Sequence, residues 1–276
     1  MKVPFELEWL GGTAEHRFRK ARPGVEELPW GTVDSSKYAP EAVNRARASW
    51  TEVAINEYRA VASFAEVLRA LVSVKAPLDL LGMTSDFLAD ECSHVELASR
   101  MAMELGGAAP RLVDFDRFTP QARRQTAFQH ANELVLRVGC IAEAFSGGTA
   151  SVSYETTSHA LPRAVYETIL RDEAHHRRLG KLYFEWALSR LDDSELRRLG
   201  QVLLVSLRAL APFWKSRAAR GVAPTPWPEE DLQALGWLGA ARFASVAKNV
   251  VVRDILDPLA TIGITITEHD RAELLA

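Results

Sequence analysis

Two stretches of the sequence, Asp90-Glu91-Cys92-Ser93-His94 and Asp172-Glu173-Ala174-His175-His176, carry the same motif, D-E-x-x-H. In an α-helix, the Glu and the His of such a motif lie on one face, one turn apart. A carboxylate oxygen and an imidazole nitrogen of each motif can therefore reach one metal ion together. Chance predicts far fewer than one such motif in this chain, so the repetition indicates a metal site carried by helices.

The apolar residues around both motifs recur every three or four positions, which predicts long helices over residues 40–73, 85–105, 121–152 and 161–191. Thr84 or Ser85 would cap the second helix, and Gly106-Gly107 would end it. The third helix is expected to break near Gly147-Gly148. A connector around residues 110–120 would cross the end of the resulting bundle.

The flanking regions complete an all-α fold. Residues 1–40 are rich in Gly and Pro and predict an irregular N-terminal arm laid over the body and anchored by Trp9 and Trp30. Further helices are predicted over residues 194–219 and 229–256, on either side of a Pro-rich joint at 224–228. The only strand candidate is the segment 261–267.

Composition excludes several classes of protein. The net charge of −3 gives no electrostatic case for binding nucleic acid. No apolar run reaches the roughly 18 residues of a membrane span, and the N-terminus lacks the pattern of a signal peptide. Two cysteines do not make a disulfide framework, so we expect a protein of the reducing cytoplasm.

Two more glutamates occupy positions that match the motifs. In an antiparallel helix pair, residues at equal height lie symmetrically about the turn. Reflecting Glu91 through the turn near residues 74–77 gives Glu57, and reflecting Glu173 through the turn near 158–161 gives Glu143. Both lie on apolar faces, where an unpaired carboxylate is costly and metal coordination offsets the cost. Glu133 is an alternative to Glu143, although its spacing fits the helix pair less well.

Two lone glutamates and two E-x-x-H motifs, one on each helix of a four-helix bundle, resemble the ferritin-like di-iron carboxylate superfamily over about residues 45–190. With the flanking regions, we expect one domain over 1–276: an arm (1–40), a ferritin-like four-helix bundle (41–191) and additional helices (192–276). The resemblance also implies two iron ions, or manganese, held by six ligands: Glu57, Glu91, His94, Glu143, Glu173 and His176.

The resemblance further assigns roles within this set. Glu91 and Glu173 would bridge both ions, Glu57 with His94 and Glu143 with His176 would each complete one ion, and Glu57 and Glu143 are the catalytic candidates. Asp90 and Asp172 each precede their own His by four residues, where a carboxylate can accept the second imidazole N–H. This form of the motif looks like that of bacterial multicomponent monooxygenases and soluble desaturases.

The function implied is a non-haem di-iron oxidoreductase that activates O2 to hydroxylate, desaturate or N-oxygenate a small organic substrate. The alternatives are a ferroxidase or peroxide-detoxifying protein, and a non-catalytic, metal-stabilised module. Amine N-oxygenases of this type commonly carry a further His where this chain has Ile169. The implied partners are O2, a small-molecule substrate, a separate electron donor and a second copy in a homodimer.

One stretch of the third helix is rich in small residues, and it allows two interpretations: Gly139, Cys140, Ala142, Ala144, Ser146, Gly147 and Gly148. These side chains would leave room for a substrate or dioxygen pocket beside Glu143, or would let two helices pack closely. The sequence favours neither interpretation over the other.

Overall fold

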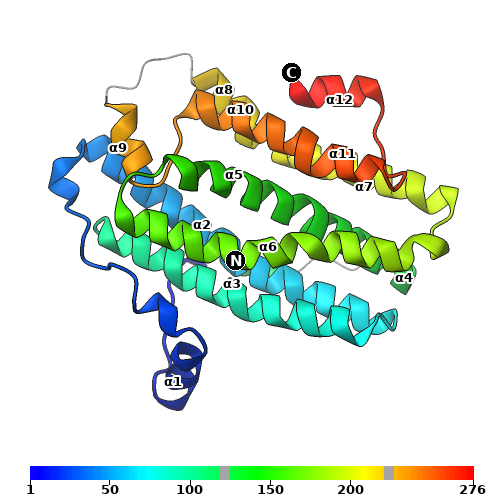
Figure 1. Cartoon of the computed structure of the whole chain (residues 1–276), viewed down its shortest axis with the longest axis horizontal. Helices are drawn as coiled ribbons and strands as arrows, with labels where there is room; N and C mark the ends of the chain where they lie inside the picture. The colour runs from blue at the N-terminus through cyan, green and yellow to red at the C-terminus, as the bar shows by residue number, and fades with distance from the viewer. Residues whose placement is uncertain (119–124, 221–226) are drawn as a thin grey trace.

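The computed structural model describes residues 1–118, 125–220 and 227–276, without the side chains of residues 217–220. Helices make up most of this part of the chain (Figure 1). The only strands within it, β1 (Val3–Pro4) and β2 (Leu112–Val113), form a two-residue antiparallel pair. The predicted all-α class is confirmed.

Four long helical segments form the centre of the fold. They are α2 (Pro40–Ser73), α3 (Leu78–Glu104), the segment from α4 (Ala127–Val135) into α5 (Glu143–Thr156), and α6 (Ala160–Ala187). The α2–α3 and α5–α6 pairs are antiparallel hairpins that pack side by side (Figure 1). The end of α3 and the start of α4 lie at opposite ends of the bundle (Figure 1), and residues 119–120 of the predicted connector lie outside the described residues.

The turn between α2 and α3 starts α3 earlier than the sequence suggested. Lys75 adopts a positive φ of 54°, and Pro77 precedes the first helical residue, Leu78. Thr84, a predicted cap, is instead buried inside the helix, where its hydroxyl donates to the carbonyl of Leu80. The predicted cap was wrong because Pro77 is the N-cap residue, directly after the tight turn at Lys75, so the helix is already formed at Thr84.

The third bundle helix is interrupted at a different place from the one predicted. A π-helical turn, Leu136–Ala142, joins α4 to α5, and the helix continues through Gly147-Gly148 without a break. A Cβ built on Gly148 would lie 2.7 Å from Val250, and one on Gly139 would lie 3.3 Å from the backbone nitrogen of Gly180. These glycines therefore allow close helix packing, the second of the two interpretations of this stretch.

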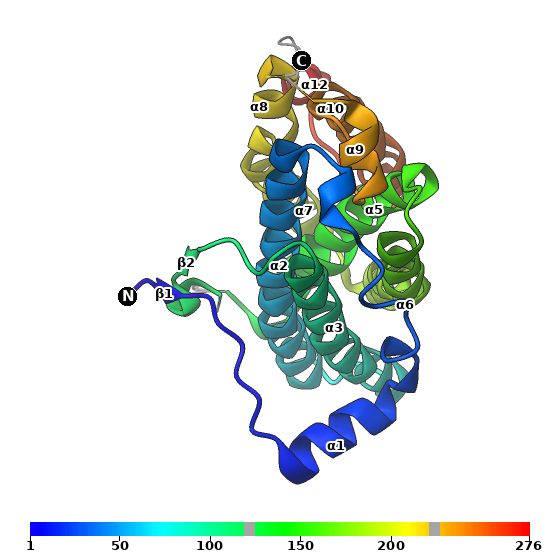
Figure 2. The ribbon, with the colours of Figure 1, turned by 90° about the vertical axis from the view of Figure 1, so that its left-hand side faces the viewer.

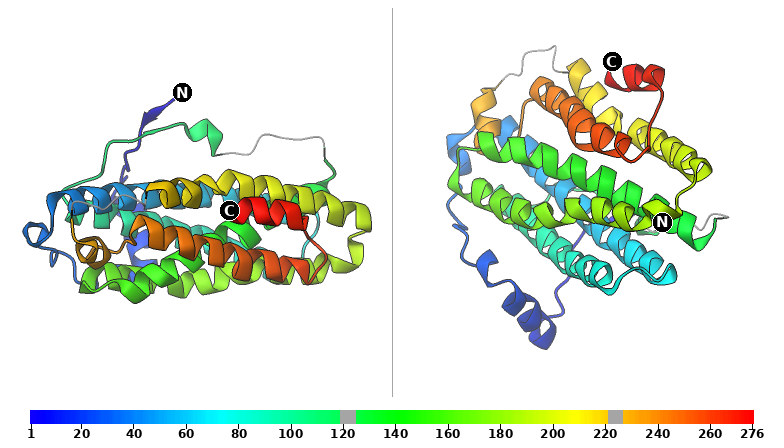
Figure 3. Two further views of the ribbon diagram at one scale, coloured as in Figure 1. Left: turned by 90° about the horizontal axis from the view of Figure 1, so that it is seen from above. Right: turned by 45° about the vertical axis from the view of Figure 1, so that its right-hand side comes forward.

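Additional helices extend the bundle along the α4–α5 side (Figure 3). The predicted helix over 194–219 is divided at Pro212 into α7 (Asp193–Leu210) and α8 (Pro212–Arg220). After it come α9 (Glu229–Ala234), α10 (Ala240–Val250), a π-helical turn (Val251–Leu256), α11 (Asp257–Ala260) and α12 (Glu268–Leu275). The segment 261–267 contains no strand, and residues 224–226 of the Pro-rich joint lie outside the described residues.

The N-terminal arm is less irregular than predicted, because it contains α1 (Gly12–Ala21). Figure 2 shows α1 standing off the bundle, with no buried residue of its own. Trp30 anchors the arm, since its indole donates to the carbonyl of Val25 and lies under the guanidinium of Arg100 at 4.1 Å. Trp9 does not anchor it: this side chain is 48% exposed and contacts Phe18 within the arm.

Two large apolar clusters lie toward the two ends of the bundle, and a third, smaller cluster contains Ile55, Val113 and Phe118. Of the two large clusters, one contains Phe64, Phe87 and Leu179, and the other contains Trp50, Leu97 and Tyr166. Along α2, α3 and α6, the segment between the two clusters carries the D-E-x-x-H motifs and Glu57. The polar residues therefore lie at mid-height, enclosed by apolar packing above and below. No described helix is both long and apolar enough to cross a bilayer.

Candidate metal centre

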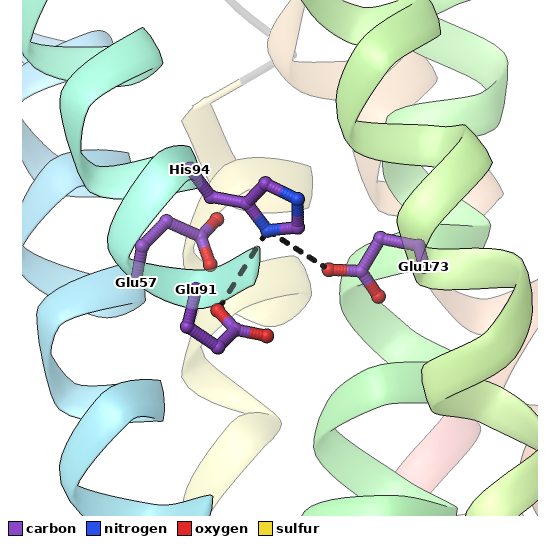
Figure 4. Close-up of side chains that lie close together, drawn as sticks. All are labelled: Glu57, Glu91, His94 and Glu173. Atoms are coloured by element: carbon purple, nitrogen blue, oxygen red, sulfur yellow. Dashed lines mark ion pairs between the residues drawn. The ribbon is translucent and has the colours of Figure 1, made fainter. Parts of the chain in front are cut away.

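Six side chains from four helices converge at mid-height of the bundle: Glu57 (α2), Glu91 and His94 (α3), Glu143 (α5), Glu173 and His176 (α6). They form two overlapping groups, in each of which one ligand atom per residue lies within 4.8 Å of the others. The first contains Glu57, Glu91, His94 and Glu173, and the second contains Glu91, Glu143, Glu173 and His176. Glu91 and Glu173 belong to both, as expected for carboxylates that bridge two ions. Figure 4 shows the first group, with all its polar ends turned toward one point.

The two imidazoles face this cluster through the same atom. Nδ1 of His94 lies 3.8 Å from both Glu91 and Glu173. Nδ1 of His176 lies 3.0 Å from Glu91 and 3.3 Å from Glu143. All these residues are buried. Glu57 is only partly buried, although its carboxylate points into the cluster (Figure 4).

The atoms that face the centre have no hydrogen-bond partner. They are both carboxylate oxygens of Glu91, Oε2 of Glu143, Oε2 of Glu173, and Nδ1 of both His94 and His176. Buried polar atoms in folded proteins are almost always paired, so these orphaned atoms require an explanation. Oxygen and imidazole donors in two groups that share two carboxylates fit a pair of divalent ions, which would satisfy all of them at once.

The two aspartates of the motifs support the imidazoles, but in a different pairing from the one predicted. Nε2 of His94 lies 3.3 Å from Oδ2 of Asp172, and Nε2 of His176 lies 3.3 Å from Oδ2 of Asp90. Each aspartate thus contacts the histidine of the other helix, not the one four residues ahead of it. A carboxylate at Nε2 favours the tautomer with the proton there, which leaves Nδ1 free to bind a metal.

The buried side chains of the cluster shift one another's pKa values. Burial, and then the charge of Glu91, raise the pKa of Glu57 well above its usual value. Burial and the charge of Glu143 do the same to Glu173. Against the opposing effect of burial, contacts with His176 and His94 lower the pKa of Glu91 to about 2. Contacts with Asp90 and Glu143, again against burial, raise the pKa of His176 to about 12.

Glu133 is excluded from the cluster. Its carboxylate accepts hydrogen bonds from Gln125, Arg137 and Arg198 at 2.7, 2.9 and 3.1 Å. Of the two glutamates that the sequence offered for this helix, the structure therefore brings only Glu143 to the other five residues.

The surroundings of the cluster are closely packed. The ring of Phe87 lies 4.1 Å from that of His176, and Ile169 is a buried apolar residue. Tyr166 turns away, and its hydroxyl donates to the carbonyl of Gly236. Two hollows of the described surface, one between α7 and residues 263–265 and one on α1, are not lined by any of the six residues.

Two arginines contact the aspartates, and the sequence analysis did not predict either of them. Arg171 contacts Asp172, its neighbour in the chain, and Arg22 of the N-terminal arm lies 3.7 Å from Asp90. Arg171 could have been noticed from its position beside the motif. No local pattern places Arg22 there, because its approach depends on how the arm folds back.

Comparison of the chain with models of protein families, with curated protein sequences and with solved structures gives no match, so the helices and the side-chain cluster alone carry the functional argument.

Proposed function

We propose that this protein is a non-haem di-iron oxidoreductase of the ferritin-like type that activates dioxygen to oxidise a small organic substrate. The observation that carries the proposal is the set of unpartnered, buried ligand atoms in two groups that share Glu91 and Glu173. When bound there, a pair of iron ions would supply the electrons that reduce dioxygen. Manganese accepts the same donors.

Each side chain of the cluster would have a distinct role at such a centre. Glu91 and Glu173 would bridge the ions, while His94 and His176 would bind one each through Nδ1. Asp172 and Asp90 would hold the two imidazoles in the correct tautomer. Glu57 and Glu143 each belong to one group only, and we assign them the catalytic role.

Electrons would come from a separate donor. The two cysteines, Cys92 and Cys140, lie apart on α3 and in the π-helical turn and form no redox pair. A protein that oxidises a substrate with dioxygen at this centre would therefore need an external reductase, or a substrate that itself supplies the electrons.

A second candidate function is metal handling, as a ferroxidase or a peroxide-detoxifying protein. The tight packing of Gly139 and Gly148 favours it, because the small side chains do not open a pocket beside Glu143. The same close packing would also be expected of a metal-stabilised module without activity.

Three measurements on the full chain separate these functions: metal content, oxygen consumption by the reduced protein, and mass by size-exclusion chromatography. The oxidoreductase predicts two irons per chain in a monomer or dimer that consumes oxygen. A large cage that takes up many irons per chain would support storage instead, and two bound metals without oxygen consumption would support the module.

Replacing Glu143 with alanine tests the assignment of the ligands. The variant should retain one iron per chain and lose oxygen consumption. Of the carboxylates in the group that contains His176, only Glu143 does not also belong to the other group, and the variant lacks it. A variant that still binds two irons would contradict the assignment.

A further inference from the structure

The two imidazoles are supported from behind by unequal partners. Asp172, which pairs with His94, is contacted by Arg171, whose side chain is 72% exposed. Asp90, which pairs with His176, lies 3.7 Å from Nη2 of Arg22, whose side chain is only 17% exposed. One aspartate is thus contacted by an arginine side chain in solvent and the other by an arginine side chain that is mostly covered.

The N-terminal arm is fixed to α3 close to this contact. One turn before Arg22, Nη1 of Arg19 donates to Oε1 of Glu96 at 2.8 Å, and the Glu96 side chain is 6% exposed. Glu26 of the arm contacts both Arg19 and Arg100, which ties the same region to α3 a second time. A buried carboxylate is tolerated only when it is paired, so these contacts hold the end of α1 against the turn of α3 that carries His94.

We propose that Arg22 is a positioning residue for His176, and that the arm thereby makes the two metal positions unequal. Because Arg19 and Glu26 fix this part of the arm to α3, the guanidinium of Arg22 stays beside Asp90 and favours the orientation of the carboxylate that accepts from Nε2 of His176. Arg171 gives Asp172 less restriction, because an exposed ion pair is screened by solvent and its side chain remains mobile. The inference rests on the proposed metal centre but not on its oxygen chemistry.

The experiment is an anaerobic titration of the full-length, metal-free protein with Co(II), followed by calorimetry and by visible absorption. Wild-type protein should bind two ions. In Arg22→Ala, one dissociation constant should rise about tenfold, by the loss of an orienting partner, while the other stays the same. The absorption of one of the two bound Co(II) ions should change with it.

Three further variants make the result specific. Arg17→Ala, an exposed residue on the same helix, should leave both constants unchanged. Arg171→Ala should change the His94 position less than Arg22→Ala changes the other. In an Asp90→Asn background, Arg22→Ala should have no additional effect if Arg22 acts through Asp90. Should Arg22→Ala melt early, Arg22→Gln and Arg22→Lys preserve the stem, and only the lysine variant should recover part of the affinity.

The outcomes separate the two proposals. A wild-type protein that does not bind two metal ions would overturn the proposed function together with this inference. A wild-type protein that binds two ions, with Arg22→Ala showing unchanged constants or an equal rise in both, would overturn the inference alone. An undiminished effect of Arg22→Ala in the Asp90→Asn background would also overturn it.

Discussion

Glu133 and Glu143 are both buried glutamates of the same helical segment, and their partners alone distinguish them. The carboxylate of Glu133 is neutralised by Arg137 and Arg198. That of Glu143 lies in the cluster, and its Oε2, 3.3 Å from Nδ1 of His176, accepts no hydrogen bond. Burial and the charge of Glu91 raise its pKa, although His176 opposes this. The same residue type is therefore a structural anion at one position and a candidate ligand at the other.

Matched substitutions should separate these roles. Glu143→Gln should reduce the bound metal from two ions to one without destabilising the metal-free protein, because it relieves repulsion among clustered carboxylates. Glu133→Gln should leave both ions bound but lower the free energy of unfolding by about 1–3 kcal/mol, since it removes the charge that accepts from Arg137 and Arg198. Metal analysis and urea unfolding measure the two effects. The opposite pattern would reverse the assignment.

A second residue-scale prediction concerns pH. Hydrogen bonds from Arg198 and Asn132, against the opposing effect of burial, lower the pKa of Glu195. Because the folded pKa lies below the unfolded one, near 4.3, its stabilising effect is complete above that pH and disappears as the pH falls through the lowered value. The difference in unfolding free energy between wild type and Glu195→Gln should thus be constant at neutral pH and shrink in acid. A difference that grows in acid would contradict it.

At the scale of the elements, glycines decide how closely the helices approach. A Cβ on Gly180 of α6 would meet the thiol of Cys140 and lie 3.3 Å from its backbone nitrogen, so α6 packs directly on the π-helical turn that leads into Glu143. A Cβ on Gly82 of α3 would have no atom within 4 Å. Gly180 is therefore needed for close helix packing, whereas the space beside Gly82 is open among the described residues.

Alanine substitutions should therefore have opposite effects at these positions. Gly180→Ala should destabilise the protein by about 1–3 kcal/mol through overpacking. Gly82→Ala should stabilise it by about 0.5–1 kcal/mol, because alanine favours a helix more than glycine does. Urea unfolding measures both. If Gly180→Ala were neutral, the close approach of α6 to the π-helical turn would be wrong.

At the scale of the whole molecule, the cluster joins α2, α3, α5 and α6 at the level where the two apolar cores are interrupted. Bringing four carboxylates together lowers the free energy of unfolding, and bound cations would raise it again. If the proposed metal centre forms, the bundle should gain part of its stability from bound metal.

Metal removal should show this dependence. Each occupied site should add about 2.7 kcal/mol at a free metal concentration 100 times its dissociation constant. A chelator should lower the melting temperature, and Fe(II) or Mn(II) should restore it. A melting temperature that is indifferent to chelation and to added metal would argue against a metal centre.

Much of this arrangement could be predicted from the sequence, because it depends on helical periodicity. The bounds of α2 match the prediction at both ends, and reflection through the turns found Glu57 and Glu143 beside the motifs. The start of α3 was predicted too late because threonine, the residue at position 84, is a typical helix cap. A threonine can cap a helix or donate to a carbonyl inside one, and the sequence alone does not tell these two roles apart.

The sequence by itself determined which residue types lie on the inner faces of the helices, since the spacing of Glu and His along a 3.6-residue turn is a local property. Tertiary structure decided the rest: that Asp90 serves His176 and Asp172 serves His94, that the small residues bring helices together, and that Arg22 reaches Asp90. Each of these depends on the distance and rotation between separate helices, which no local pattern along one helix specifies.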